Sequence, residues 1–172
     1  MGRKKYRNTT KAHLLMGELS GFSKQLKPNL VPEIKIQYNK GRRVLGNVKS
    51  SDDAAAFIRA QYKRGTIEAQ ETFNVIYLDN RNSILGYYQH SKGSLTSTLV
   101  DTRLIFAVAL KSLSTGIILS HNHPSGKLKP SQSDIKVTRN IKWIGDLHNI
   151  EVLDHIIVTK DGHYSFADEL IL

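Results

Sequence analysis

Two histidines separated by one residue are the strongest chemical feature of this sequence. They lie in the stretch SHNHPSGKLKPSQSD, residues 120–134. In an extended segment, side chains at positions i and i+2 project to the same side, so His121 and His123 are expected to point toward one place. Pro124 strengthens this expectation, because the residue before a proline is disfavoured in helical geometry and favours extended geometry.

A carboxylate follows the two histidines at Asp134, across a turn rich in Pro and Gly and in the first turn of a predicted helix. From there it can face back over the loop. Two imidazoles and one carboxylate leave the fourth position of a tetrahedral Zn²⁺ open for water, which is the pattern of a catalytic rather than a structural zinc site. We therefore expect one Zn²⁺ per chain, with iron or manganese as poorer matches to the same ligands.

Each part of this pattern has a simpler interpretation. The tripeptide His-Asn-His at a strand end, taken alone, is also consistent with a polar loop. Ser131 and Asp134 form an S-x-x-D capping box, in which the side chains satisfy free N–H groups of a helix. The two interpretations of Asp134 compete, because a metal-bound carboxylate is not free to cap its own helix. Ser131 can cap in either case.

The combined spacing resembles a known motif. His-x-His, seven residues, Ser, two residues and Asp is the downstream half of the JAMM motif of JAB/MPN-type metalloproteases. The version in this chain, HNHPSGKLKPSQSDIKVTRNIK, resembles the RadC-like branch of that family, as do YLDNRNSILG and VLDHIIV. The family's motif begins with a glutamate at the start of an earlier core strand, where this chain has Glu71 in QETFNVIYLD.

The resemblance implies a fold, a reaction and a role for each motif residue. The fold is an α/β three-layer sandwich, with a mixed β-sheet flanked by helices as in cytidine deaminases. The reaction is hydrolysis of a peptide or isopeptide bond in a peptide or protein substrate. Glu71 would move the proton of the attacking water, and Ser131 would donate a hydrogen bond to the oxyanion. The implied zinc ligands are His121, His123 and Asp134.

Other zinc chemistries are excluded by composition. The chain has no cysteine, which removes thiolate zinc sites, cysteine nucleophiles and the zinc nucleobase deaminases. No HExxH sequence occurs, which removes the thermolysin-like zinc proteases. His155, in the pair Asp154-His155, is expected to be a neutral core histidine beside a sheet or a hydrogen-bond partner of a metal ligand.

The periodicity of the sequence predicts the elements that must position these residues. Strands are expected at 33–39, 72–79, 83–90, 115–123, 151–159 and 163–167, and helices at 50–65, 96–113 and 131–150, with a short helical stretch at 11–19. Residues 72–79 are nearly continuous in β-branched and aromatic side chains, which indicates an interior strand that forms a hairpin with 83–90. Residues 96–113 are apolar on nearly all sides in their second half, which predicts a well-buried helix. The order indicates an α/β sandwich with a mixed sheet.

Charge divides the chain into a basic N-terminal extension, residues 1–45, and a RadC-like domain, residues 46–172. The first 50 residues hold 12 of the 25 Lys and Arg but only two acids, so they carry the whole formal net charge of +10. Such a segment suits contact with nucleic-acid phosphates, or it is a solvated tail that aids solubility. The proposed nucleic-acid contacts are Arg3, Lys4, Lys5, Arg7, Lys11, Arg42 and Arg43.

Two classes of function therefore remain open. The first is a zinc metallopeptidase. The second is an accessory protein of DNA repair or of a mobile element, which contacts DNA through its basic extension and uses the zinc domain as a scaffold. No apolar run approaches the 18 residues of a membrane span, and the start MGRKKYR leads into no apolar stretch of a secretory signal. We expect a cytoplasmic protein without a membrane partner.

Overall fold

The computed structural model describes residues 46–63, 65–93 and 100–172. The strand expected at 33–39, the helical stretch at 11–19 and the seven basic residues proposed for nucleic-acid contact lie outside these ranges. The described chain runs in the order α2 (Ser51–Gln61), β1 (Thr72–Leu78), β2 (Ile84–Lys92), α3 (Thr102–Ser112), β3 (Gly116–Asn122), α4 (Gln132–His148), β4 (Glu151–Val158) and β5 (His163–Ser165).

The five strands form one mixed sheet in the order β2-β1-β3-β4-β5. The pair β3 and β4 is parallel, because α4 connects them as a crossover helix, and the other neighbours are antiparallel. The expected hairpin is present as β1 and β2. Every residue of β1 and β3 is buried, as expected for interior strands with continuous apolar sequence.

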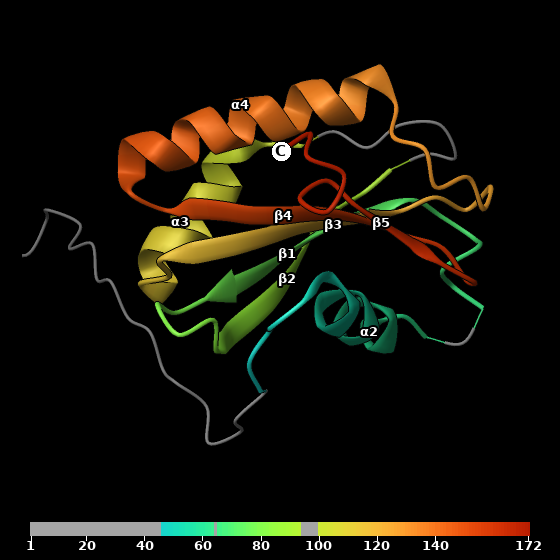
Figure 1. Ribbon diagram of the computed structural model, residues 1–172, viewed down its shortest axis with the longest axis horizontal. Helices are drawn as coiled ribbons and strands as arrows, with labels where there is room; N and C mark the ends of the chain where they lie inside the picture. The colour runs from blue at the N-terminus through green and yellow to red at the C-terminus, as the bar shows by residue number, and fades with distance from the viewer. Residues whose placement is uncertain (1–45, 64, 94–99) are drawn as a thin grey trace, which may run out of the picture. The chain divides into compact units, whose positions relative to one another are not determined.

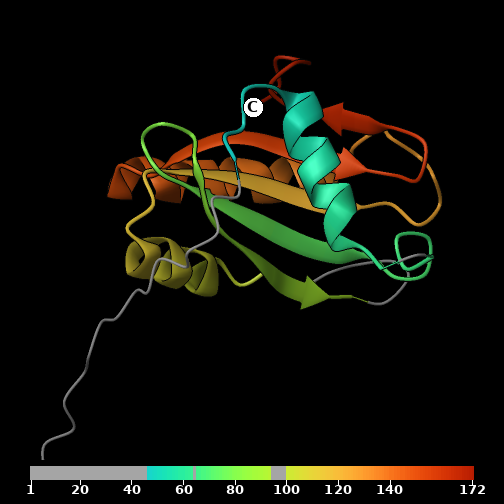
Figure 2. The same cartoon turned by 90° about the horizontal axis from the view of Figure 1, so that it is seen from below.

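Helices cover both faces of the sheet, so the fold is the expected α/β sandwich. In Figure 1, α4 lies above the sheet and α2 below it, and Figure 2 shows α2 in front of the sheet with α4 behind it. One core cluster joins the sheet to α3 and α4, and a second joins it to α2. Among the described helices, none is long and apolar enough to cross a membrane.

Strand alternation decides which side chains face which layer. In β1, Phe73 and Val75 pack in the cluster with α3 and α4, whereas Ile76 packs in the cluster with α2. In β3, Leu119 belongs to the first cluster and Ile118 to the second. Odd-numbered residues of both strands therefore face α3 and α4. His121, the next odd-numbered residue of β3, is expected to point to the same side.

Two helices differ from their expected form. Helix α2 ends at Gln61 rather than at Gly65, because Tyr62 leaves helical geometry and its hydroxyl enters a buried hydrogen-bond network. The prediction that α3 is well buried was wrong. Leu104 and Leu110 of α3 are 48% and 51% exposed, and its buried residues lie on one face only. The buried face of α3 packs on β1 and β2, and Phe106 also contacts His148 of α4 with ring centroids 5.6 Å apart, while the opposite face of α3 stays exposed.

Helix α4 crosses close to the start of β4. A side-chain carbon added at Gly145 would collide with the backbone carbonyl oxygen of Ile150, so only glycine fits there. The helix ends four residues later at Asn149, which adopts left-handed geometry as the C-cap. The close approach holds α4 against the sheet, and α4 carries one of the predicted metal ligands in its first turn.

Candidate metal centre

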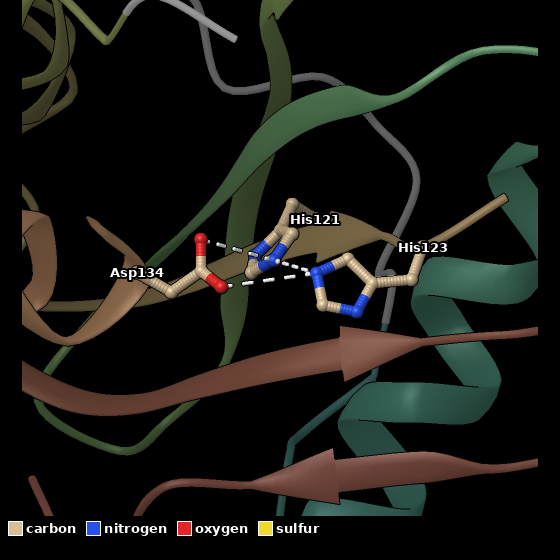
Figure 3. Close-up of side chains that lie close together, drawn as sticks. All are labelled: His121, His123 and Asp134. Carbon is tan, nitrogen blue, oxygen red and sulfur yellow. Dashed lines mark hydrogen bonds and ion pairs between the residues drawn. The ribbon is translucent and has the colours of Figure 1, made fainter. Parts of the chain in front are cut away.

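Three side chains converge at the C-terminal end of β3 (Figure 3). His121 is the second-last residue of β3, His123 follows the strand, and Asp134 lies in the first turn of α4. Nε2 of His121 lies 2.9 Å from Nε2 of His123 and 3.5 Å from Oδ1 of Asp134. Nε2 of His123 lies 3.8 Å from Oδ2 of Asp134. The structure thus brings together all three residues that the sequence predicts as metal ligands.

These separations suit a tetrahedral ion. Ligand atoms about 2.0–2.1 Å from a tetrahedral Zn²⁺ lie about 3.3 Å from one another. The three observed separations fall on both sides of that value. Nδ1 of His123 lies 2.6 Å from the carbonyl oxygen of Lys127. Because a carbonyl only accepts, Nδ1 carries the hydrogen and the lone pair of Nε2 faces His121 and Asp134. A lone pair directed at a carboxylate and a second imidazole is stabilised by a cation between them.

Asp134 caps its helix through Oδ2 and faces the two histidines with both oxygens, Oδ1 toward His121 and Oδ2 toward His123. Its Oδ2 accepts hydrogen bonds from the backbone N–H and the hydroxyl of Ser131, both at 2.6 Å, and the hydroxyl oxygen of Ser131 accepts the N–H of Asp134. The capping box is therefore complete, while Oδ1 faces His121. The expected competition between capping and metal binding does not arise, because the carboxylate has two oxygens.

The carboxyl of Asp134 is held in its charged form. Burial alone raises its pKa, but the neighbouring His121 and the hydrogen bonds from Ser131 outweigh burial and hold the pKa well below its usual value. The group is consequently an ionised carboxylate at neutral pH, which is the form that a metal ion requires.

His155 of β4 lies directly behind His121. Its Nε2 is 2.8 Å from Nδ1 of His121, and its Nδ1 is 2.5 Å from Oγ1 of Thr138. The ring is fully buried and stacks on Phe166 with ring centroids 4.7 Å apart. Burial, with a further contribution from His121, lowers the pKa of His155 well below its usual value. His155 thus meets both expectations at once, as a core histidine and as a hydrogen-bond partner of a candidate ligand.

Glu71 lies directly ahead of β1, two residues before Phe73. Phe73 pairs with His121 of β3, and the antiparallel ladder between the two strands ends at this pair. The start of β1 therefore lies beside the end of β3 that carries the candidate ligands. The group of side chains that could hold an ion consists of His121, His123 and Asp134 and does not include Glu71 among the described residues.

Comparison with known proteins agrees with this geometry. The RadC-like JAB domain matches residues 48–171. The chain belongs to this family. A UPF0758 protein of Flavobacterium johnsoniae is 43% identical over 125 residues, which cover 73% of this chain and 53% of that protein. A UPF0758 protein of Chlorobaculum tepidum is 35% identical over 154 residues, covering 88% and 67%. The chain therefore spans about half the length of the Flavobacterium relative.

In this RadC-like JAB domain, the residue between the two histidines is also engaged. Asn122 points to the opposite face of the sheet and is fully buried. Its Oδ1 accepts the backbone N–H of Thr72 at 2.8 Å, and its Nδ2 donates to the carbonyls of Ile67 and Gln70 at 2.7 and 2.9 Å. It ties the segment that leads into β1 to the end of β3. Nothing in the sequence pattern marked Asn122, since its partners lie about 50 residues away.

Ser131 caps α4 in the RadC-like JAB domain and is exposed at the mouth of the site. Its hydroxyl donates a hydrogen bond to Asp134, and this bond would have to break before the hydroxyl could donate to an oxyanion.

A cavity of about 410 Å³ opens beside His123. It is lined by the loop after β3 and the turn between β4 and β5, and of the three candidate ligands it is lined by His123. A second cavity of about 180 Å³ lies on the α2 side, beside Lys49 and Asp168.

Proposed function

We propose that this RadC-like JAB domain is a zinc-dependent hydrolase of peptide or isopeptide bonds. The observation that carries the proposal is the convergence of two imidazole Nε2 atoms and the carboxylate of Asp134, with N–N and N–O separations of 2.9 to 3.8 Å. A Zn²⁺ ion held by these groups supplies Lewis acidity, which lowers the pKa of water to about 7. In this proposal a substrate segment occupies the cavity that adjoins His123.

The remaining chemistry falls to the chain's own residues. Glu71, directly ahead of β1, takes the proton from water at its carboxylate and delivers it to the leaving amine. Ser131 sits beside Asp134 and donates its hydroxyl hydrogen to the oxyanion after leaving the carboxylate. Loss of one such donor typically raises the barrier by about 3–4 kcal/mol. His121, His123 and Asp134 hold the ion and take no proton.

Two measurements on the same preparations test this proposal. Protein purified without chelator is analysed for metal, and the wild type and Glu71→Gln are compared in a peptide-library cleavage assay. We expect about one zinc per chain in both proteins, and cleavage at least about 100-fold slower in the variant, the usual contribution of a positioned acid or base. Unchanged cleavage by Glu71→Gln would remove Glu71 from the mechanism. A wild type without bound metal would overturn the zinc site.

A second proposed function rests on charge. The first 50 residues carry the whole net charge of +10, and phosphate contacts of that kind bind nucleic acid in a salt-dependent way. In this alternative the zinc domain is a scaffold and the extension contacts DNA. It predicts DNA binding that weakens with salt and disappears when residues 1–30 are deleted. Peptide cleavage that survives this deletion, with no DNA binding by the full chain, would exclude it.

A further inference from the structure

We propose that Thr138, which lies outside the ligand motif, sets the tautomer of His121 by way of His155 and so presents the Nε2 lone pair of His121 to the metal. Thr138 is buried on α4, one turn after Asp134. This role rests on the proposed zinc site, but it also specifies the direction of three hydrogens: those on the Thr138 hydroxyl, on Nδ1 of His155 and on Nδ1 of His121. Thr138 and His155 are positioning residues in this scheme, since neither reaches the ion.

The hydrogen of the Thr138 hydroxyl has one possible acceptor. Oγ1 lies 2.6 Å from the backbone carbonyl oxygen of Asp134 and 2.5 Å from Nδ1 of His155. A carbonyl oxygen cannot donate. If the hydroxyl donated to His155 instead, two oxygens would face each other at 2.6 Å with no hydrogen between them, which is repulsive. The hydroxyl therefore donates to Asp134, and Nδ1 of His155 must supply the hydrogen of the second bond.

The second step passes through the His155 ring. This ring is fully buried and contacts Phe73 and Phe166, surroundings in which a second proton and its charge are disfavoured. With its one hydrogen on Nδ1, His155 has a bare Nε2 that can only accept. Nδ1 of His121 lies 2.8 Å from it and must donate. His121 then keeps its lone pair on Nε2, the atom that faces Asp134 and lies 2.9 Å from Nε2 of His123, so a cation is needed between the two bare nitrogens.

The hydrogen bonds also form one path through three elements. They run from His121 on β3 to His155 on β4, then to Thr138 on α4 and on to the backbone of Asp134. The carboxylate of that same Asp134 faces His121. Two of the three proposed ligands are thus joined by a path that needs no metal. Valine has nearly the same shape as threonine, so what Thr138 adds at this position is its hydroxyl group.

Zinc affinity measures this role without a substrate. The full chain is titrated with Zn²⁺ in competition with a chelator, as wild type, Thr138→Val and Thr138→Ser. We expect the valine variant to bind zinc about 10- to 100-fold more weakly, the usual cost of losing an outer hydrogen bond to a metal ligand. The serine variant keeps the hydroxyl and should stay within a few-fold of wild type. Tyr77→Phe removes another buried hydroxyl, bonded to Ile105, and should not change affinity.

The nitrogen shifts of the histidine rings supply a readout that packing changes alone would not move. In wild type loaded with Zn²⁺ at pH 8, ¹⁵N NMR should show His121 and His155 both with hydrogen on Nδ1. In Thr138→Val, His121 should shift toward the tautomer with hydrogen on Nε2. Hydrogen on Nε2 of His121 in the wild type would overturn the inference even if the valine variant did not fold.

Failure of the inference and failure of the zinc site can be told apart. If the wild type binds zinc, and Thr138→Val changes neither the zinc affinity nor the His121 tautomer, the inference is overturned but the proposed zinc site is not. A wild type that binds no zinc overturns the proposed function, and the tautomer of His121 then decides the inference by itself.

Discussion

The side chain of Asn122 holds the backbone on both sides of Glu71. It accepts the N–H of Thr72 at 2.8 Å and donates to the carbonyl of Gln70 at 2.9 Å. The proposed base is therefore anchored from the face of the sheet opposite to the metal ligands. One tripeptide, His-Asn-His, thus supplies two candidate ligands on one face and a clamp for the proposed base on the other.

Asn122→Ala should lower the free energy of unfolding by about 1–3 kcal/mol. The substitution leaves the buried backbone N–H of Thr72 without its partner, and an unsatisfied buried group costs about that much. Urea denaturation measures the change. Ser120→Ala is the matched control, because Ser120 lies on the same strand and face and its hydroxyl has no hydrogen-bond partner within the described structure. A loss in Asn122→Ala no larger than in Ser120→Ala would contradict the clamp.

Ser131→Ala and Asp134→Asn should separate helix capping from metal binding. Ser131→Ala removes the N-cap hydroxyl and should cost about 1 kcal/mol of stability while zinc is retained. Asp134→Asn removes the charge that faces His121 and should lower the zinc content strongly. Zinc analysis together with thermal denaturation distinguishes the two. A full zinc complement in Asp134→Asn would exclude its role as a ligand.

Metal-free protein should become less stable as the pH falls from 7.5 to 5. The unfolded chain takes up a proton at His155 near its usual pKa of about 6.5, whereas burial keeps the folded ring neutral. The unfolded state then binds more protons, so the free energy of unfolding falls with pH, by at most about 1.4 kcal/mol per pH unit for one group. His90, whose pKa burial also lowers, adds a change of the same sign.

Urea denaturation at several pH values in the presence of a chelator measures this slope. His155→Gln should flatten it, because the ring that titrates is gone. A slope equal to that of the wild type would show that His155 is not the group responsible. The carboxylate of Asp134 acts in a lower window, below about pH 4, since its folded pKa lies under its unfolded one.

Gly145→Ala should destabilise the protein by about 1–3 kcal/mol. The added carbon meets the backbone carbonyl of Ile150, which cannot move without shifting the start of β4. Gly86→Ala on β2 is the control, since a carbon added there meets nothing within 4 Å. Equal stability of the two variants would contradict the close packing of α4 on β4.

Much of the architecture follows from local patterns. The continuous apolar runs of β1 and β3 indicate interior strands. The 3-residue spacing that includes Thr138 and Ile141 indicates the buried face of α4, but Leu147 at the same spacing is 64% exposed. Spacing alone also brings His121 and His123 to one side, because alternation along a strand is a local property. The extent of burial of α3 is not local. From the sequence, Leu104 and Leu110 are expected to be buried. In the structure both are about half exposed, because the core covers only one face of α3.

By itself, the sequence determined the ligand types, their spacing and the elements that carry them, since all of these depend on neighbours within a few residues. Only the tertiary structure decided which nitrogen of His121 is free, because that depends on His155, 34 residues away, and on Thr138 of another element. It also decided that Asn122 anchors the flanks of Glu71 and that Asp134 can cap its helix and face the histidines at once. Hydrogen-bond direction is a property of groups in contact, and those contacts exist only after β3, β4 and α4 have packed together.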